Sequence, residues 1–341
     1  MTDTNKQDKH FYLRHNDALM NSTKLSMKAK QSILLSKAEN TINAYESDWF
    51  DFVDWCNYQK VSYFPATPET IVNYINDLAD YAKANTIARR ISAISENYNA
   101  SGSHENPCMS PLVKQALRGI RRLKGTFQQG KTPILLEDVE DILEAMNTID
   151  IPEIQKLRDK AILLIGFMGA FRRSEIAAIT VENLKFSPQG LEIFLAASKA
   201  DQEGQGAIVA IPNLPGSSLD AVRALKKWLS FSGITSGPVF RGFTKSMTLR
   251  STAISDKSIA DIVKRYVTLI GLDPTMYGAH SLRHGFATTA ASYGVEERNI
   301  MRQTRHHSVN MVRRYINEAN KFVDNPISTI FEKRLNPKDN S

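Results

Sequence analysis

Apolar residues in the first third of this chain recur at steps of three and four, a spacing that only a helix turns into one continuous face. Three such stripes follow one another, formed by Ile42, Tyr45, Trp49, Phe52 and Cys56; by Ile71, Ile75, Leu78 and Ala82; and by Ile87, Ile91, Ile94 and Tyr98. Thr67 followed by Pro68 has the form of an N-cap and a first-turn proline, and a fourth helix is expected over roughly 110–124. Since no stripe can bury itself, the pattern predicts a small all-helical domain over residues 36–124.

The stretch "GTFQQGKTP" (125–133) has the composition of a linker, with two glycines, polar residues and a proline. Residues 1–35 show no clean period and are expected to form a flexible N-terminal arm. A second, α-rich domain is expected over 134–341, where "GLEIFLAASKADQEGQGAIVAIP" alone departs from helix and predicts a small antiparallel β-hairpin with Lys199 near its tip. The apolar run 161–171 is too short to cross a bilayer and predicts a buried helix. The predicted fold class is mainly α, in two domains, as a length of 341 residues allows.

The net charge of +7 and the pI near 9.2 favour a polyanionic partner, nucleic acid before membrane. The two cysteines, Cys56 and Cys108, suit neither a disulfide framework nor a zinc ribbon. The opening "MTDTNKQDKH" lacks the apolar stretch of a signal peptide. We therefore expect a protein of the reducing cytoplasm with no membrane partner.

Two of the expected helices carry positive charge away from their apolar stripe. Arg89 lies opposite Ile87 at 100° per residue, and Arg90 sits beside it. On the fourth helix one face carries Lys114, Arg118, Arg121 and Arg122. A solvated face would explain either helix alone, but two such faces in one small domain favour DNA contact. Arg89 and Arg90 are expected on a helix that enters the major groove.

Four segments of the second half carry groups that could hold an anion or move a proton: "GAFRRSEI" (169–176), "SKAD" (198–201), "HSLRH" (280–284) and "RHHSVNMVRRY" (305–315). His280 and His284 are four residues apart, as zinc ligands on a helix can be. The Glu of a metalloprotease helix does not follow His280, however, and Arg283 would place a cation beside the metal. We therefore expect no metal site.

Taken together, the four segments resemble those of the tyrosine recombinase (phage integrase) family, whose functional residues follow the order Arg, Lys, His-x-x-Arg, His or Trp, Tyr. That order is met by Arg172, Lys199, His280, Arg283, His306 and Tyr315, and Glu175 completes the family's Arg-x-x-Glu arrangement. "AENTINAY", "WCNYQKVSYFPATPE" and "NTIARRI" also look like segments of Cre-type recombinases, so the likeness covers about residues 38–335.

The register is open at two points. The family has glycine before its His or Trp, whereas this chain reads "TRHHS"; His306 is chosen over His307 because it precedes Tyr315 by nine residues, the family's interval. Arg172 is chosen over Arg173 because it lies three residues before Glu175. Another tyrosine near the site, Tyr293, is expected to be a packing residue.

A phosphodiester resists attack because its non-bridging oxygens are negatively charged. Guanidinium groups can neutralise that charge by binding these oxygens in a fork, and we assign this role to Arg172 and Arg283. The resemblance implies the other roles: Tyr315 attacks and forms a 3′-phosphotyrosyl bond, and His280 assists proton transfer at this nucleophile. It also implies that Lys199 protonates the leaving 5′ oxygen, that His306 hydrogen-bonds the phosphate and that Glu175 orients its neighbours. Such a site requires no cofactor, no metal and no ATP.

The resemblance also implies an assembly. Two domains would close as a clamp on duplex DNA, two protomers would bind an inverted-repeat site, and a homotetramer would exchange strands through a Holliday junction. The protein would be a bacterial, phage-encoded or plasmid-encoded enzyme of the cytoplasm that acts at the nucleoid. An apolar cluster of Ile327, Ile330, Phe331 and Leu335 is expected on a terminal helix that docks into the neighbouring protomer. The alternatives are a non-catalytic DNA-binding regulator and a topoisomerase IB-like or telomere-resolving relative.

Overall fold

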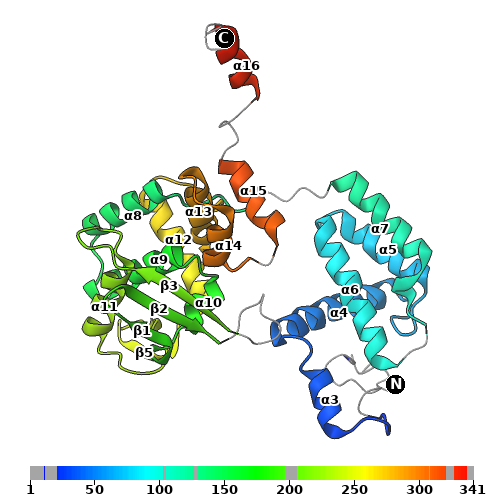
Figure 1. Ribbon diagram of the computed structural model, residues 1–341. Helices are drawn as coiled ribbons and strands as arrows, with labels where there is room; N and C mark the ends of the chain where they lie inside the picture. Colours follow the sequence, from blue (N-terminus) through cyan, green and yellow to red (C-terminus); the bar gives the residue numbers. More distant parts are fainter. Residues whose placement is uncertain are drawn as a thin grey trace. The chain divides into compact units, whose positions relative to one another are not determined.

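The computed structural model describes residues 11, 21–102, 105–125, 130–196, 206–306, 308–319 and 326–335 (Figure 1). Its contacts divide the chain into two compact units, residues 1–129 and 130–341, which are described separately. The boundary between them falls inside the glycine-containing stretch expected to be a linker.

Unit 1 is built from helices, which form the blue-to-cyan cluster of Figure 1. Its elements are α3 (Met27–Leu34), α4 (Glu39–Gln59), α5 (Pro68–Ala79), α6 (Ala84–Ser101), the 3₁₀ turn η1 (Pro107–Met109) and α7 (Pro111–Lys124). The three predicted stripes lie in α4, α5 and α6, except that Ala82 of the second stripe follows the end of α5. Thr67 caps α5 by accepting a hydrogen bond from the Thr70 N–H at 3.3 Å. The helices predicted from the stripes are therefore confirmed.

The core of unit 1 consists of large aromatic side chains from different helices. Trp49 and Tyr98 meet edge to face with their ring centroids 6.2 Å apart, as do Phe52 and Tyr74 at 5.1 Å. All four side chains are fully buried, and edge-to-face pairs of this kind stabilise a core beyond the area that they bury. The stripes thus interlock into one core, as the sequence predicts.

Both cysteines lie in this core. Cys56 and Cys108 are buried as free thiols, and burial raises the pKa of each thiol to about 12. A thiol held protonated in this way is a poor nucleophile at neutral pH, because the thiolate is the reactive form.

Helix α3 lies within the segment that the sequence indicates as an arm. The Ser26 hydroxyl caps it by accepting from the Ala29 N–H at 3.2 Å, but Met27 and Leu35 are 72% and 76% exposed. A helix of two turns that buries no apolar face shows no periodic spacing of apolar residues. The sequence pattern therefore could not predict α3.

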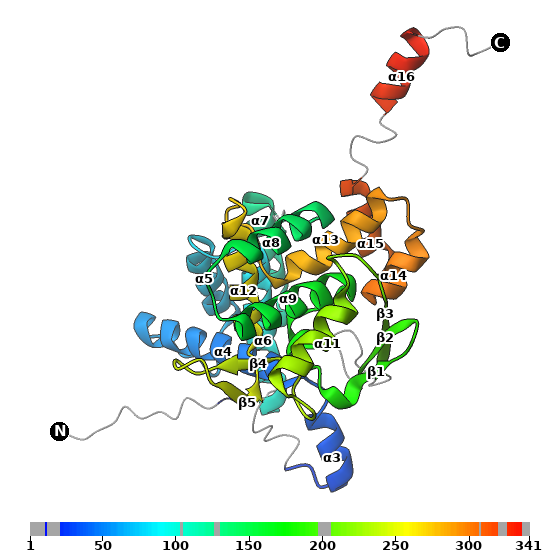
Figure 2. The ribbon, with the colours of Figure 1, turned by 90° about the vertical axis from the view of Figure 1, so that its left-hand side faces the viewer.

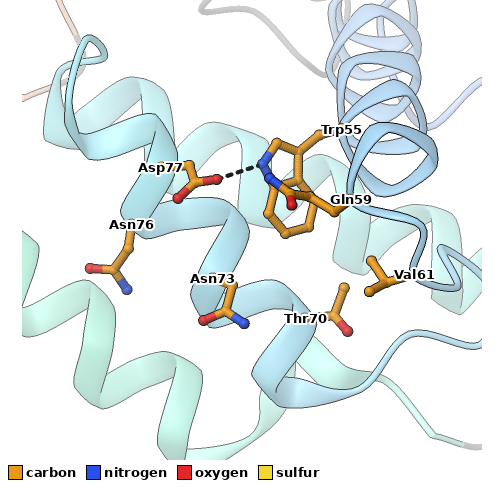
Figure 3. A pocket seen from close by; sticks show the side chains of 7 residues that line it. All are labelled: Trp55, Gln59, Val61, Thr70, Asn73, Asn76 and Asp77. Atoms are coloured by element: carbon orange, nitrogen blue, oxygen red, sulfur yellow. Dashed lines mark hydrogen bonds between the residues drawn. The ribbon is translucent and has the colours of Figure 1, made fainter.

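A hollow of about 320 Å³ lies on unit 1 where the end of α4 meets α5 (Figure 3). Its lining is Trp55, Gln59, Val61, Thr70, Asn73, Asn76 and Asp77. Asp77 is engaged, because its carboxylate accepts a hydrogen bond from the Trp55 indole at 2.9 Å. None of the candidate site residues lines this hollow.

Unit 2 is mainly helical and carries two small sheets. Its helices are α8 (Leu136–Thr148), α9 (Glu153–Met168), α10 (Arg173–Ala178), η2 (Val181–Asn183, 3₁₀), α11 (Ala221–Ser232), α12 (Asp256–Leu269), α13 (Ala279–Ser292), α14 (Glu297–Thr304), α15 (Val309–Ala319) and α16 (Pro326–Leu335). Its strands are β1 (Leu184–Phe186), β2 (Gly190–Leu195), β3 (Ala207–Pro212), β4 (Arg241–Phe243) and β5 (Leu249–Ala253).

The predicted hairpin is confirmed as β2–β3, which pair antiparallel from Gly190 opposite Pro212 to Leu195 opposite Ala207. The expectation that this hairpin is the one exception to helix is wrong. Strand β1 adds to it as an edge, and β4 pairs with β5 in a second sheet. These extra strands have three to five residues and little full burial, so they lack the alternation that marks a strand.

Helix α9 is the centre of the core of unit 2, with α11 and α13 packed against it (Figure 2). It contains most of the apolar run and confirms the predicted buried helix, although the helix ends at Met168. Within the described residues, no helix is long and apolar enough to span a membrane.

Helix α13 lies against the start of unit 2 because Gly285 has no side chain. A Cβ on Gly285 would stand 1.6 Å from the Ile134 carbonyl oxygen, and the Ile134 N–H donates to the Ser281 carbonyl at 3.1 Å. We expect Gly285→Ala to lower the free energy of unfolding by about 3 kcal/mol or more, since backbone has to move. Urea denaturation measures this change.

Gly119 in α7 provides the matched control, since it is a helical glycine with nothing within 4 Å of its added Cβ. Gly119→Ala should raise the free energy of unfolding by about 0.5–1 kcal/mol through helix propensity. Equal effects of the two substitutions would contradict the close approach of α13.

Candidate active site

Arg172 and Glu175 form a clamp at the start of α10. Arg172 is the N-cap residue, and its backbone N–H and its Nη1 donate to the two Glu175 carboxylate oxygens at 2.9 and 2.6 Å. Glu175 is buried, whereas the Arg172 side chain stays 21% exposed. Burial raises the pKa of Glu175, but the charge of Arg305 and the Arg172 donors outweigh it and hold this pKa below its ordinary value. The carboxylate therefore stays ionised and fixes Arg172.

The turn between α9 and α10 presents backbone carbonyls to arginine side chains. Ala170 has a φ of 46°, the left-handed region, which non-glycine residues seldom adopt. Its carbonyl accepts from Arg283 Nη1 at 2.8 Å and from Arg305 Nη2 at 3.1 Å. The C-terminus of a helix is the negative end of its dipole, so cations are favoured there.

Arg283 is a fully buried cation whose donors are mostly unused. Within the described part of the chain, its Nε and Nη2 are buried and have no hydrogen-bond partner. Burial, followed by the charges of Arg172 and Arg305, lowers the pKa of Arg283 to about 9, so it is still charged at neutral pH. A buried charge without a partner is costly, and an anion at these two nitrogens would remove that cost.

Helix α13 brings His280 and Arg283 together with His284. His280 is exposed at the residue level; partial desolvation and then the charges of Arg283, His284 and Arg172 lower its pKa to about 4. His284 is buried, and its Nδ1 lies 3.0 Å from the Lys131 carbonyl oxygen. His280 is thus neutral at physiological pH and able to accept a proton.

Tyr315 lies on α15 between two histidine rings. Its ring centroid is 4.8 Å from that of His284 and 5.6 Å from that of His306. The side chain is 8% exposed and packs in a small cluster with Ala287, Ala291, Ile300 and Val312. Helix α13 and the loop before α15 therefore place the predicted nucleophile beside His284 and His306.

His306 is buried in the loop between α14 and α15. The Thr304 hydroxyl donates to the Ile300 carbonyl at 2.7 Å, so its oxygen is left to accept from His306 Nδ1, also at 2.7 Å. Burial and then the charges of Arg283, Arg172, His280 and Arg305 lower the pKa of His306 to about 3. Nδ1 therefore carries the proton of the neutral ring, and Nε2 carries a lone pair.

Arg305 also belongs to this cluster, although no sequence pattern indicated it. Its Nη2 donates to Glu175 at 2.8 Å, and its guanidinium lies over the Phe171 ring, 4.9 Å from the centroid. The one sign in the sequence was that Arg305, in "TRHHS", stands where the family has glycine. Nothing in the sequence alone indicates which acceptors an arginine at that position would find.

Lys199, and His307 as the alternative to His306, lie outside the described residues. The choice of Arg172 over Arg173 is consistent with the geometry, since Arg173 is 55% exposed and pairs instead with Asp256 at 3.0 Å. Tyr293 is 69% exposed at the end of α13, so its expected packing role is wrong.

Arg89 and Arg90, on α6 of unit 1, form ion pairs with acidic residues of α4. Arg89 Nη1 lies 2.9 Å from Asp48, whereas Arg90 is half-buried, contacts Asp51 and donates to the Tyr74 hydroxyl at 3.0 Å. Arg89 keeps 46% of its side chain exposed. Of the two, Arg89 is thus the more accessible to a ligand.

The predicted basic face of α7 is exposed along its length. Exposed side chains on it are Lys114, Arg118, Arg121 and Arg122. Val113 and Ile120 of the same helix are buried in the core of unit 1, so the charged residues lie away from the buried side. The face could therefore meet a polyanion without rearrangement of the core.

The cluster in unit 2 gathers three guanidiniums, from Arg172, Arg283 and Arg305, around a single carboxylate, Glu175. Such an excess of positive charge is suited to an oxyanion of one or two charges, and Arg presents the fork geometry that phosphate requires. Among the described residues there is no group of three or more His, Cys, Asp or Glu that could hold a metal ion.

The lowered histidine pKa values predict acid lability. Because the native pKa values of His280 and His306 lie below the ordinary 6.5, the unfolded chain binds more protons than the native one below that pH. We expect the free energy of unfolding to fall as the pH drops from about 7 towards 4, and the depressed pKa of Glu175 to extend the loss below its ordinary value of 4.5.

Urea denaturation as a function of pH measures the effect. His306→Asn should reduce the slope by up to about 1.4 kcal/mol per pH unit, one proton's worth. An unchanged slope in that variant would show that His306 titrates normally in the folded protein.

Two family models match the chain. Residues 134–321 match the phage integrase family, and residues 31–100 match the phage integrase N-terminal SAM-like domain. An "Integrase/recombinase xerD homolog" of Selenomonas ruminantium is 51% identical over 326 residues, which cover 95% of each chain. A "Tyrosine recombinase XerD" of Rickettsia bellii is 24% identical and covers 82% of this chain and 88% of its own.

Solved structures share the fold. A XerH site-specific recombinase bound to palindromic difH substrate, in a post-cleavage complex, superposes with a TM-score of 0.65, 17% identity and 94% of each chain covered. A lambda integrase dimer bound to a COC′ core site gives a TM-score of 0.56 and 15% identity over 89% of this chain and 94% of its own.

Proposed function

Because this chain belongs to the phage integrase family of tyrosine recombinases, we propose that it cuts and rejoins duplex DNA at a specific site through a 3′-phosphotyrosyl intermediate. The observation that carries the proposal is Arg283, a buried guanidinium with two nitrogens unpaired among the described residues, in the same cluster as Tyr315. A phosphodiester would pair those nitrogens and give the tyrosine its substrate.

In the proposed reaction, the Tyr315 oxygen attacks the scissile phosphorus while the bond to the 5′ oxygen breaks. The tyrosine proton passes to His280, whose neutral ring can accept it, and the leaving oxygen takes a proton from Lys199 and departs as a 5′ hydroxyl. Arg172 and Arg283 bind the non-bridging oxygens, where their interactions strengthen as charge builds in the transition state. Attack by a 5′ hydroxyl on the phosphotyrosyl bond reverses these steps, so the phosphoester energy is conserved.

His306 contributes a hydrogen bond to the phosphate only after it gains a proton. Since Nδ1 already donates to Thr304, Nε2 must be protonated in order to donate. The phosphate would raise the pKa of His306 from its low value, because an anion favours the imidazolium. Glu175 holds Arg172 in place throughout.

The proposal extends to the assembly. The chain would close its two domains, residues 36–124 and 134–341 joined through 125–133, as a clamp on DNA. Two protomers would occupy an inverted-repeat site, and four would exchange strands through a Holliday junction. Ile327, Ile330, Phe331 and Leu335 of α16 are 52% exposed or more and would bind a neighbouring protomer. The work would be done at bacterial, phage or plasmid DNA in the cytoplasm.

Covalent trapping tests the proposed function. Wild-type protein is mixed with a randomised pool of nicked inverted-repeat duplexes in the presence of EDTA, and SDS-stable protein–DNA adducts are collected and sequenced. An adduct formed in EDTA supports a metal-independent tyrosine mechanism and yields the target sequence. DNA binding without any adduct would favour the non-catalytic regulator. The products made on the recovered site then distinguish exchanged strands from relaxed circles, as a topoisomerase would give, and hairpins, as a telomere resolvase would give.

The α7 face should supply phosphate contacts. Single alanine substitutions of Arg118, Arg121 or Arg122 are expected to lower DNA affinity at any sequence and to reduce the salt slope of binding by about one unit each. Fluorescence anisotropy against salt concentration measures this. Lys185→Ala, which removes the same charge from β1, is the control. Equal slopes for the α7 variants and the wild type would rule out phosphate contact.

A further inference from the structure

We infer that Arg305 is a positioning residue for the proposed reaction: its guanidinium ties the turn between α9 and α10, with Arg172 and Glu175, to the loop that carries His306. The inference rests on the proposed function, since it assigns Arg305 to the geometry of that site. Arg305 is not among the residues that the resemblance indicates.

The contacts of Arg305 cross between distant parts of the sequence. Nη1 donates to the Gly169 carbonyl at 3.0 Å and to the Gln303 carbonyl at 2.8 Å. Nη2 donates to the Ala170 carbonyl at 3.1 Å and to Glu175 Oε2 at 2.8 Å. Three of these four acceptors lie more than 100 residues earlier in the chain, so a local role in the α14–α15 loop does not explain them.

The backbone at Arg305 points to the same conclusion. Its φ and ψ are 54° and 45°, the left-handed region, where a residue with a Cβ is disfavoured by about 1–2 kcal/mol. Ala170, whose carbonyl accepts from Arg305, has a φ of 46°. The Arg305–Ala170 hydrogen bond therefore joins two residues with disfavoured backbone conformations, and the contacts of the guanidinium offset the conformational free energy of both.

Arg305 is not arranged as a phosphate ligand. A guanidinium has five N–H donors, and four hydrogen bonds to protein acceptors occupy both of its terminal nitrogens. Arg283 instead has a whole edge, Nε and Nη2, without partners among the described residues. On Arg305 only Nε has no partner among the described residues, so Arg305 has one donor left, whereas Arg283 has the two-nitrogen fork that binds phosphate.

Loss of Arg305 would release both phosphate-binding arginines together. Glu175 accepts from Arg305 and from Arg172, and the Ala170 carbonyl accepts from Arg305 and from Arg283. Misplacement of reacting groups by about 1 Å can cost about 10²-fold in rate. We therefore expect the chemical step to slow while binding of the rest of the DNA is unchanged.

Arg305→Gly is the informative variant, because glycine takes the left-handed conformation freely and the loop keeps its path. On the DNA site recovered by trapping, we expect adduct formation to slow about 10²-fold and DNA affinity to stay within about threefold of wild type. Millimolar guanidinium ion should restore the rate by binding where the side chain was, and urea at the same concentration should not. Arg298→Ala on α14, an exposed arginine paired with Glu296, removes the same charge and should behave as wild type.

Each other outcome overturns the inference. An unchanged rate would mean that Arg305 positions nothing, and a parallel fall in affinity would make it a DNA ligand. A loss that follows a lowered melting temperature and ignores guanidinium would make its role structural only. If wild-type protein forms no adduct with any duplex, the proposed function fails instead, which the wild-type arm shows separately.

Discussion

Substitution of Tyr315 by phenylalanine is expected to lower the rate of covalent adduct formation by at least about 10⁴-fold and to leave DNA affinity unchanged. The substitution removes the attacking oxygen and nothing else of substance. The ring keeps its place against His284 and His306 and inside the cluster of Ala287, Ile300 and Val312, so the fold should persist. Trapping in SDS measures the rate, and anisotropy measures the affinity.

Tyr293→Phe is the matched control, because that tyrosine is in the same unit, at the end of α13, but is 69% exposed. It should form adduct at the wild-type rate. An adduct of equal yield from Tyr315→Phe would mean that another side chain is the nucleophile. Loss of DNA binding in the same variant would mean that Tyr315 holds the structure of the site.

Arg283→Met is expected to abolish adduct formation and yet to stabilise the free protein. Arg283 is fully buried, its charge has no direct carboxylate partner among the described residues, and only Nη1 makes a hydrogen bond there. A buried charge without a partner is costly, and even a buried ion pair is often replaced by apolar side chains of similar volume with a gain of about 1–4 kcal/mol. The rate should fall by about 10³-fold or more, because the transition state loses a fork on its developing charge.

Thermal and urea unfolding of the two proteins, with and without inorganic phosphate, measure the stability part. Phosphate should stabilise the wild type more than Arg283→Met, because the wild type alone has the unpaired nitrogens. Arg283→Lys should stay inactive, since an ammonium keeps the charge but not the fork. A wild-type rate in Arg283→Met would remove this arginine from the proposed chemistry.

The sequence predicted those features that depend on spacing along one element. Helices α4, α5 and α6 follow from stripes that they bury, and α9 follows from a continuous apolar run. His280 and Arg283 are three residues apart on α13, so a single helix decides their proximity. The distant parts of the cluster, Arg172 and Tyr315, followed only from the resemblance.

The features that were missed depend on tertiary contacts. Arg305 donates hydrogen bonds to the Gly169 and Ala170 carbonyls. These carbonyls are available to it because α9 ends at Met168 and Ala170 adopts a left-handed conformation. The spacing of residues along the sequence does not indicate this contact between Arg305 and the turn after α9. In the same way, Arg90 has a charge pattern typical of a DNA contact, but Asp51 and Tyr74 engage it from neighbouring helices. Charge patterns do not reveal which cations the fold has already paired.

The burial of Cys56 and Cys108 makes this chain a convenient subject for site-directed labelling. Both thiols lie in the core of unit 1 with a pKa of about 12, and the sequence has no other cysteine. A maleimide dye should therefore react with cysteines introduced at exposed positions and leave the native pair untouched. One donor fluorophore on α7 and one acceptor on β1 would then report the distance between the two units in solution, without prior removal of any native residue.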